Sequence, residues 1–228
     1  MPTELWSQFD AAPLALTLRV AAVATGLALL LGVALGWVFA RTRLPGRALL
    51  EAVCMLPLVL PPTVLGYGIL VLMGRRGAVG GWLRQHFDYI IIFNWHGAVV
   101  ASTLVALPLV LKGASSAFAQ VDRNLEAAAR TLRQSGWSSF LRVTLPLSAP
   151  GVISALLIVM IPTVGDYVTP KLVGGKDGVM IANAIQAQFG KAANWPLGAA
   201  LSVTTMVVVT AMAGLSVLAL RLFARALR

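Results

Sequence analysis

About five separate runs of apolar residues, each roughly 20 residues long and flanked by Arg, Pro or Gly, dominate this chain of 228 residues. A run of that length can cross a hydrocarbon core about 30 Å thick. Inside a bilayer every backbone polar group has to be paired within the protein, which restricts crossing segments to helices or closed barrels. These runs are continuous rather than alternating, so they predict helices. We therefore expect an all-α polytopic membrane protein with spans near residues 14–38, 49–73, 97–118, 146–165 and 196–223.

The composition agrees with residence in a membrane and limits the partners. Hydrophobic residues make up 58% of the chain and charged residues 11%, whereas soluble domains carry roughly 25% charged residues. The formal net charge of +10 is also found in nucleic-acid binders, but polytopic membrane proteins concentrate basic residues in cytoplasmic loops. We therefore expect contact with membrane lipid and none with nucleic acid. Cys54 is alone in the chain and is interpreted as a small buried residue of the second span.

The distribution of basic residues between the loops predicts the orientation. Five spans place the two termini on opposite sides of the membrane. Eleven basic residues fall on the side of Arg41, namely Arg41, Arg43, Arg47, Lys112, Arg123, Arg130, Arg133, Arg142, Arg221, Arg225 and Arg228. Six fall on the other side, namely Arg75, Arg76, Arg84, Lys171, Lys176 and Lys191. The more basic side is cytoplasmic by the positive-inside rule, which predicts an outside N-terminus and a cytoplasmic C-terminus.

Prolines interrupt three of the expected spans. Pro57, Pro61 and Pro62 fall in the second span, Pro108 in the third and Pro162 in the fourth. Each proline removes a helical hydrogen bond and bends its helix. Because broken helices are tolerated where neighbours or a wet cavity satisfy the freed groups, the pattern favours a bundle that encloses a pathway.

The segment 121–142, between the third and fourth spans, is too charged to cross lipid. Its apolar residues recur at the spacing of one helix face, at Leu125, Ala128, Ala129 and Leu132. Asp122 or Asn124 can cap the start of this helix. The pattern pauses at 134–136 and restarts in an apolar piece at 137–141. We predict a short helix across the cytoplasmic face, at about residues 122–139, with a turn and a second apolar piece. On periodicity alone, an amphipathic helix resting on the membrane also fits.

This segment and the residues after it resemble the EAA loop of binding-protein-dependent ABC importers of the type I fold. The letters EAA stand at 126–128, LPL at 145–147 and PG at 150–151, at the spacing of that family. The resemblance implies that residues 1–228 form one transmembrane domain of an ABC transporter permease. In the family the EAA helix inserts into a cleft of the ATPase subunit and transmits its closure to the spans. The residues assigned to this coupling are Glu126, Ala127, Ala128, Leu132 and Arg133, although Arg133 replaces the glycine of the family.

The resemblance also implies partners. These are an ATPase subunit in two copies, a second permease copy and an extracytoplasmic substrate-binding protein, all at a bacterial inner membrane. A phosphate-binding loop needs Ser or Thr after its Gly-Lys pair, whereas Asp177 follows the pair at 175–176. We therefore expect no cofactor on this chain and ATP hydrolysis in the partner subunit. His86 and His96 are single and make a metal site improbable, and the spans lack the residue constellations of an enzyme.

Two parts of the chain resemble different subfamilies of these permeases. Residues 41–152 resemble molybdate permeases, especially at 56–83 and 95–102. Residues 161–202 resemble spermidine/putrescine permeases, especially at 161–175 and 194–202. The longer resemblance favours molybdate and a homodimer, whereas a polyamine importer would pair two different permeases.

Charge gives a second argument about the cargo. Arg75 and Arg76 at the outer mouth would attract a dianion such as molybdate. Asp166 and Tyr167, at the outer end of the fourth span, would instead suit an ammonium group through charge and ring contacts. Each of these four pathway or gate candidates also has an ordinary interpretation as a solvated loop or helix-end residue.

A different class of transporter stays open at this stage. A channel or secondary transporter would need carboxylates within the membrane for ion coupling, and Asp166 is the one candidate that this interpretation identifies. In such a protein the EAA helix would have no partner, which disfavours that class.

Overall fold

The computed structural model describes residues 10–42 and 45–226, except for the side chains at 219 and 222–226. In this part of the chain the regular structure is helical. The helices are α2 (Ala12–Arg41), α3 (Arg47–Val59), α4 (Pro62–Met73), α5 (Ala78–Phe87), α6 (Trp95–Ala119), α7 (Arg123–Thr131), α8 (Gly136–Ser139), η1 (Phe140–Thr144), α9 (Leu145–Gly165), α10 (Val168–Val173), α11 (Ile181–Gly190) and α12 (Trp195–Ala226).

Four helices of the described chain are long and apolar enough to cross a membrane. They are α2, α6, the continuous segment Gly136–Gly165 and the portion Trp195–Leu218 of α12. Helix α3 and the segment Pro62–Phe87, which are bent by 113° relative to each other, are together long and apolar enough to count as a fifth crossing if they form one broken span. The predicted all-α fold with about five transmembrane helices is thereby confirmed.

The second crossing differs from the single bent span expected at 49–73. Helix α3 ends at Val59, α4 starts at Pro62, and the chain continues beyond Met73 into α5. The cause is the proline pair 61–62, because neither residue can donate a helical hydrogen bond and the residue before a proline avoids the α conformation. Leu60 is accordingly extended, with ψ of 141°.

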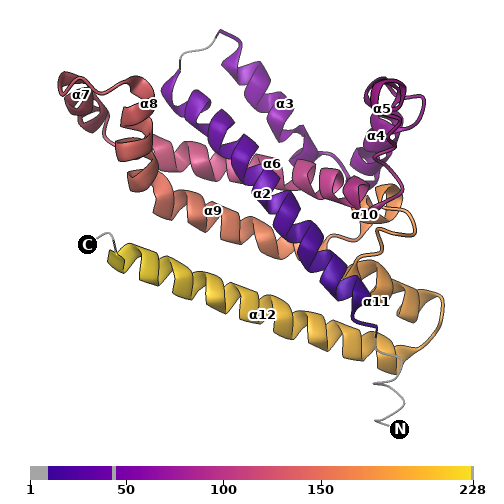
Figure 1. The fold of residues 1–228 in the computed structure, drawn as a ribbon. Helices are drawn as coiled ribbons and strands as arrows, with labels where there is room; N and C mark the ends of the chain where they lie inside the picture. The colour runs from indigo at the N-terminus through magenta and orange to yellow at the C-terminus, as the bar shows by residue number, and fades with distance from the viewer. Residues whose placement is uncertain (1–9, 43–44, 227–228) are drawn as a thin grey trace.

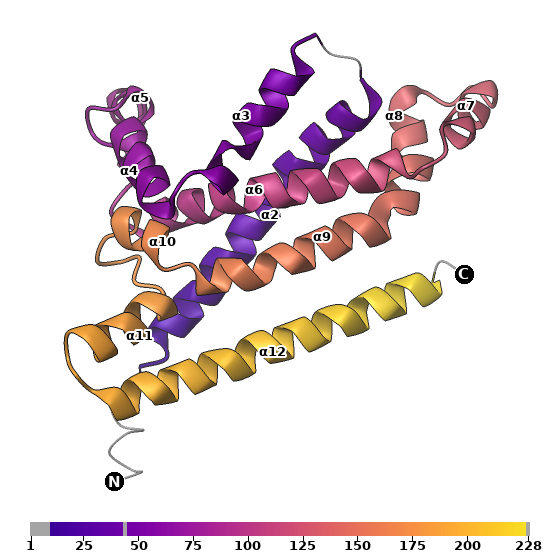
Figure 2. The same ribbon diagram turned by 180° about the vertical axis from the view of Figure 1, so that it is seen from behind.

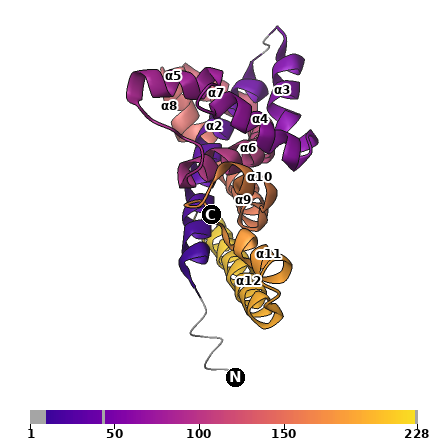
Figure 3. The same ribbon diagram turned by 90° about the vertical axis from the view of Figure 1, so that its right-hand side faces the viewer.

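The bundle has three layers. Helices α2, α6 and α9 form the middle layer, with α3, α4 and α5 on one side and α11 and α12 on the other (Figures 1 and 3). Helix α6 is the most enclosed crossing, whereas few residues of α12 are buried in the single chain. The same layers are seen from behind in Figure 2.

Small residues allow the middle helices to approach closely. A Cβ added at Gly32 of α2 would lie 2.7 Å from the Val110 side chain of α6, and one at Gly36 would lie 2.9 Å from Ala114 Cβ. A Cβ at Gly113 of α6 would lie 2.2 Å from Ala155 Cβ of α9. Without a hydrophobic driving force between helices in lipid, such close backbone packing is what holds membrane bundles together.

The bundle has two functional ends that we name by their helices. The α7 end carries the C-terminal ends of α2 and α6, together with α7 and α8 (Figure 1). The α10 end carries α5, α10 and α11 and the start of α6. Arg41 and Arg123 lie at the α7 end, and Arg84 and Lys171 lie at the α10 end, in the groups that the loop count predicted.

Three details correct the sequence interpretation. Lys112 lies inside α6 rather than in a loop, where its ammonium pairs with Glu51 of α3. Glu51 is therefore a second carboxylate within the crossing segments, beside the expected Asp166. Cys54 is only half-buried, because the described chain buries no residue of α3. Arg43 and Arg228 lie outside the described residues, as does the side chain of Arg225.

Candidate functional site

Helix α7 is the short amphipathic helix that the sequence predicted at the start of 122–139. The side chain of Asp122 accepts a hydrogen bond from the backbone N–H of Asn124 at 2.8 Å, which makes Asp122 the N-cap. The helix continues to Thr131, and Leu132 is its C-cap. Of the two predicted caps, Asp122 is therefore the one used.

Arg133 ends α7 in a left-handed conformation, with φ of 61°. The N–H of Arg133 bonds to the carbonyl of Arg130 at 3.0 Å, and the N–H of Gln134 bonds to the carbonyl of Ala129 at 3.3 Å. These two bonds define a Schellman motif with Arg133 at C′, the position where helices prefer glycine. The geometry explains why glycine suits this position and shows that arginine can adopt the same turn.

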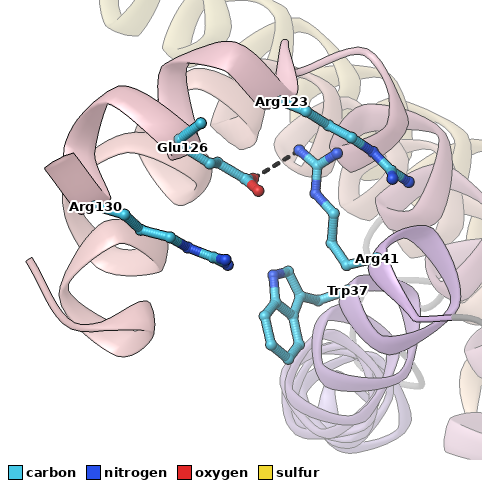
Figure 4. Close-up of a pocket in the computed structure, with 6 residues that line it drawn as sticks. Trp37, Arg41, Arg123, Glu126 and Arg130 are labelled. Carbon is cyan, nitrogen blue, oxygen red and sulfur yellow. Dashed lines mark ion pairs between the residues drawn. The ribbon is translucent and has the colours of Figure 1, made fainter.

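Glu126 points inward from α7 rather than outward to a partner (Figure 4). Its Oε1 lies 2.7 Å from Nη2 of Arg41, the last residue of α2. The same oxygen accepts a hydrogen bond of 2.7 Å from the hydroxyl of Thr144, at the end of η1. Arg41 Nη2 also donates to the carbonyl of Val121 at 3.1 Å. One carboxylate therefore joins three segments that are distant in sequence.

A cavity of about 470 Å³ lies beside this ion pair. It is lined by Trp37, Arg41, Arg123, Glu126, Ala127 and Arg130 (Figure 4). Arg123 and Arg130 form no ion pair within the part of the chain that the structure describes. The cavity therefore carries three guanidinium groups and one carboxylate, an excess of positive charge.

The apolar residues of α7 do not form its buried side, contrary to a helix packed through its apolar face. Of Leu125, Ala128, Ala129 and Leu132, only Ala129 is buried. Leu125 is 47% exposed and Leu132 is 78% exposed. Glu126 and Ala129 face the bundle, and Leu125 borders a cavity that is also lined by Leu147 and Pro150 of α9. Ala128 and Leu132 are exposed.

The second apolar piece after α7 is the start of the fourth crossing and does not lie across the surface. Helix α8 continues through the π-turn η1 directly into α9. Phe140 packs against Trp37 of α2 with ring centroids 5.4 Å apart, and against Trp137 at 5.5 Å. Helices α8 and α9 are therefore one continuous helical segment, so a displacement of α8 would move the transmembrane helix.

At the α10 end, Arg75 and Arg76 line a second cavity of about 620 Å³. Arg84, Trp82 and Gln85 of α5 line it as well, and the N-terminal residues of α5 close one side. The three arginines are exposed and form no ion pair within the described residues. Sequence reasoning missed Arg84, which lies two turns along α5 and could have been found from the helical spacing.

Asp166 and Tyr167 line neither of these two cavities. The ring and hydroxyl of Tyr167 are in contact with the ammonium of Lys171, which lies 4.6 Å from the ring centroid. Asp166 is half-buried, and its Oδ2 has no hydrogen-bond partner among the described residues. The ring contact expected for a foreign ammonium group is therefore made by this chain's own lysine.

The described residues contain no group of three or more His, Cys, Asp or Glu side chains that could hold a metal ion.

A helical bundle with four or five membrane crossings and a short amphipathic helix at one end defines a multi-pass membrane protein. The chain belongs to the binding-protein-dependent transport system inner membrane component family, whose sequence pattern matches residues 28–228. The predicted recognition as a type I ABC importer permease, and the location in an inner membrane, are confirmed at this level.

Relatives of both predicted kinds occur. The chain is 41% identical over 152 residues to the molybdenum transport system permease protein ModB of Escherichia coli (strain K12), covering 67% of this chain and 66% of that protein. It is 36% identical over 200 residues to ModB of Azotobacter vinelandii, covering 84% of this chain and 88% of that protein. It is 30% identical over 200 residues to the spermidine/putrescine transport system permease protein PotB of Escherichia coli (strain K12), covering 86% of this chain and 73% of that protein.

Solved structures share the fold at low identity. A chain of the inward-facing MetNI methionine ABC transporter matches with a TM-score of 0.73 and 18% identity, covering 92% of this chain and 94% of that one. A chain of a bacterial ABC transporter involved in the import of the acidic polysaccharide alginate matches with a TM-score of 0.70 and 13% identity, covering 94% of this chain and 81% of that one. These likenesses establish the arrangement of helices.

Proposed function

We propose that this chain is the permease subunit of an ATP-driven importer of molybdate. The choice of molybdate as the cargo rests on the sequence identity of 36–41% with permeases named for molybdenum transport, against 30% with a polyamine permease. The chain provides the pathway, and a separate subunit hydrolyses ATP.

Helix α7 is the proposed docking element for that ATPase subunit, with Ala127, Ala128 and Leu132 in contact with it. The support is that Ala127, Ala128 and Leu132 are exposed, while Glu126 and Ala129 hold the helix to the bundle. Burying a leucine against a partner stabilises the contact by about 2 kcal/mol. The excess positive charge of Arg123 and Arg130 suits a rim of acidic residues on the ATPase.

A second permease copy is proposed to complete the pathway, giving two permeases and two ATPases. Helix α3 buries no residue within the described chain, and α12 exposes Leu215 and Met206 among others. Lipid covers part of these surfaces. Glu51 of α3 forms an ion pair with Lys112 of α6. A helix face that holds such charges is better suited to contact with a protein neighbour than with hydrocarbon.

The α10 end is proposed to face the outside, where a substrate-binding protein delivers the cargo. Arg75, Arg76 and Arg84 give that end a positive field that attracts an oxyanion. Lys171 adds a further cation and occupies the ring of Tyr167. Permeases of polyamines would require the opposite sign.

The orientation has a direct test by cysteine labelling. In a Cys54→Ser background, Asp177→Cys places a thiol on the exposed α10 end. We expect an impermeant maleimide to label it in intact cells or right-side-out vesicles. Labelling only after permeabilisation would place the α10 end and the N-terminus in the cytoplasm instead.

Polyamine import is the second candidate function, and Asp166 is the residue that favours it. The test is uptake in proteoliposomes containing the permease, its ATPase and a matching binding protein, with molybdate in one arm and spermidine in the other. We expect molybdate uptake that depends on ATP, and Asp166→Asn to leave it equal or faster, since a buried carboxylate opposes a dianion. Spermidine uptake that falls on Asp166→Asn would replace molybdate by a polyamine.

A further inference from the structure

Arg41, Glu126 and Thr144 form a compact group that we name the Arg41 cluster. It joins the C-terminal end of α2, the first half of α7 and the end of η1 just before α9. Both contacts converge on one atom, Glu126 Oε1, at 2.7 Å each. The three segments are separated by 85 and 18 residues in sequence (126 − 41 and 144 − 126), so no local rule of helix formation requires them to meet.

The Arg41 cluster is enclosed, unlike the other ion pairs of the described chain. The Arg41 and Glu126 side chains are 9% and 15% exposed. The Lys112 and Glu51 side chains are 58% and 28% exposed, and Arg47 is 44% exposed. A charge pair shielded from water is sensitive to geometry, because removing either partner leaves an uncompensated charge. The Arg41 cluster therefore holds the three segments in one arrangement, whereas the exposed pairs do not.

Helix α7 has little else to hold it to α2. Ala129 is its only buried residue, and its main packing neighbours are η1 and α8. Among the described residues, its other hydrogen bond to α2 runs from Arg123 to the carbonyl of Ala40 and is 3.4 Å long. A force on α7 can reach α9 through the continuous backbone of α8 and η1. It reaches α2 through Arg41.

We propose that Arg41 is a positioning residue that fixes α7 against both α2 and α9, so that a displacement of α7 by the ATPase moves these two transmembrane helices together. This inference rests on the proposed function of α7 as the docking element. Arg41 touches neither the cargo nor ATP and acts through Glu126.

The chemistry of the guanidinium group suits this role. Arg41 Nη2 serves both Glu126 and the carbonyl of Val121, the residue just before the α7 cap. A lysine keeps a positive charge beside Glu126, but its shorter side chain places the ammonium one atom short of the position of Nη2. Arg41→Lys should therefore restore part of the function that Arg41→Gln removes. If Arg41 acted through its charge alone, lysine would restore the function fully, and if it acted through packing alone, the charge of the lysine would restore nothing.

The test uses the full permease co-assembled with its ATPase subunit in proteoliposomes, with molybdate and a molybdate-binding protein as the probe. The variants are Arg41→Gln, Arg41→Lys, Thr144→Val and the double variant Arg41→Gln with Glu126→Gln. Arg142→Gln is the matched control, because Arg142 is an exposed arginine of the same end, two residues from Thr144, with no ion pair among the described residues. The readouts are ATP hydrolysis with and without loaded binding protein, uptake, and hydrogen exchange of the α7 amides in the permease.

We expect Arg41→Gln to lower the stimulation of ATP hydrolysis by loaded binding protein at least about fivefold, the scale of typical coupling between sites. Arg41→Lys should lie between Arg41→Gln and wild type, and the double variant should be no worse than Arg41→Gln, since paired residues act as a unit. The α7 amides should exchange faster in Arg41→Gln and Thr144→Val than in wild type or Arg142→Gln. Co-purification of the ATPase with each variant shows that docking itself is retained.

Wild-type stimulation and wild-type α7 exchange in Arg41→Gln would overturn the proposal. If Arg41→Gln does not fold, the double variant Arg41→Gln with Glu126→Gln decides the same question, because it removes the link to α2 and leaves no unpaired charge. A wild-type complex without ATP-dependent molybdate uptake would overturn the proposed function instead, and α7 exchange would still decide whether Arg41 positions the helix.

Discussion

Arginines at the two ends of the bundle have opposite surroundings. At the α7 end, Arg41 is enclosed and bonded to Glu126 at 2.7 Å. At the α10 end, Arg75, Arg76 and Arg84 are exposed around a cavity and have no ion pair within the described chain. A count of basic residues by loop treats all four alike, although Arg41 fixes a geometry and the other three create a field. Substitution at the α7 end should therefore change stability and coupling, whereas substitution at the α10 end should change rates in a salt-dependent way.

The largest effect is expected from removing the carboxylate of the enclosed pair. Glu126→Ala leaves the Arg41 charge unpaired, and breaking such a pair costs about 3 kcal/mol of unfolding free energy. Denaturant or thermal unfolding of the purified permease measures the loss. Asp177→Ala, an exposed carboxylate of the α10 end, is the control and should stay within about 0.5 kcal/mol of wild type. A loss below about 1 kcal/mol for Glu126→Ala would mean that the pair is no more structural than a surface pair.

The next effect concerns the exposed side of α7. Leu132→Ala should weaken binding of the ATPase by about 2 kcal/mol, roughly 30-fold, because it removes apolar area that only the partner buries. Titration of immobilised permease with ATPase provides the measurement. Leu215→Ala on α12 is matched in type and exposure and should leave binding unchanged. Equal binding by Leu132→Ala and wild type would exclude this side of α7 from the interface.

A smaller effect is expected from the field at the α10 end. Arg75→Gln with Arg76→Gln should slow molybdate uptake about fivefold at low salt, and the difference should disappear as salt screens exposed charges. Lys191→Gln removes an exposed cation outside the cavity and controls for net charge. An effect that persists at high salt would indicate a specific contact at Arg75 or Arg76. The arginines of the α10 end would then act through a fixed contact, as Arg41 does at the α7 end.

The smallest effect tests the turn after α7. Arg133→Gly should raise the unfolding free energy by about 0.5 kcal/mol, because glycine adopts the left-handed conformation without a Cβ clash. Arg130→Gly, inside the helix, should lower it by about 1 kcal/mol. Thermal unfolding of the two variants gives opposite signs if the Schellman turn is present in solution. A decrease with both substitutions would contradict it.

Periodicity and prolines predicted most of the fold, and local motifs predicted helix α7. Asp122 caps α7 as expected because capping depends on residues two or three positions apart. The partner of Glu126 could not be predicted, because Arg41 comes from another span and carries no motif that distinguishes it from Arg47 or Arg123. For the same reason the pairing of Lys112 with Glu51 could not be predicted; Lys112 was counted with the loops although the expected span at 97–118 contains it. Contacts between distant segments depend on the three-dimensional packing of the helices, which composition and spacing do not contain.

The break between α3 and α4 has a consequence for water and for the barrier properties of the membrane. Pro57, Pro61 and Pro62 cannot donate to the carbonyl groups four residues before them, at Val53, Pro57 and Leu58. Lipid cannot satisfy unpaired carbonyl oxygens, and residues 58–64 around the break are exposed in the single chain, so water or a neighbouring subunit has to reach the break. A single copy would therefore carry hydrated backbone into the bilayer, unless the second permease copy that we propose covers it. Pairing of the subunits would then restore the seal against ions at the same step that completes the pathway.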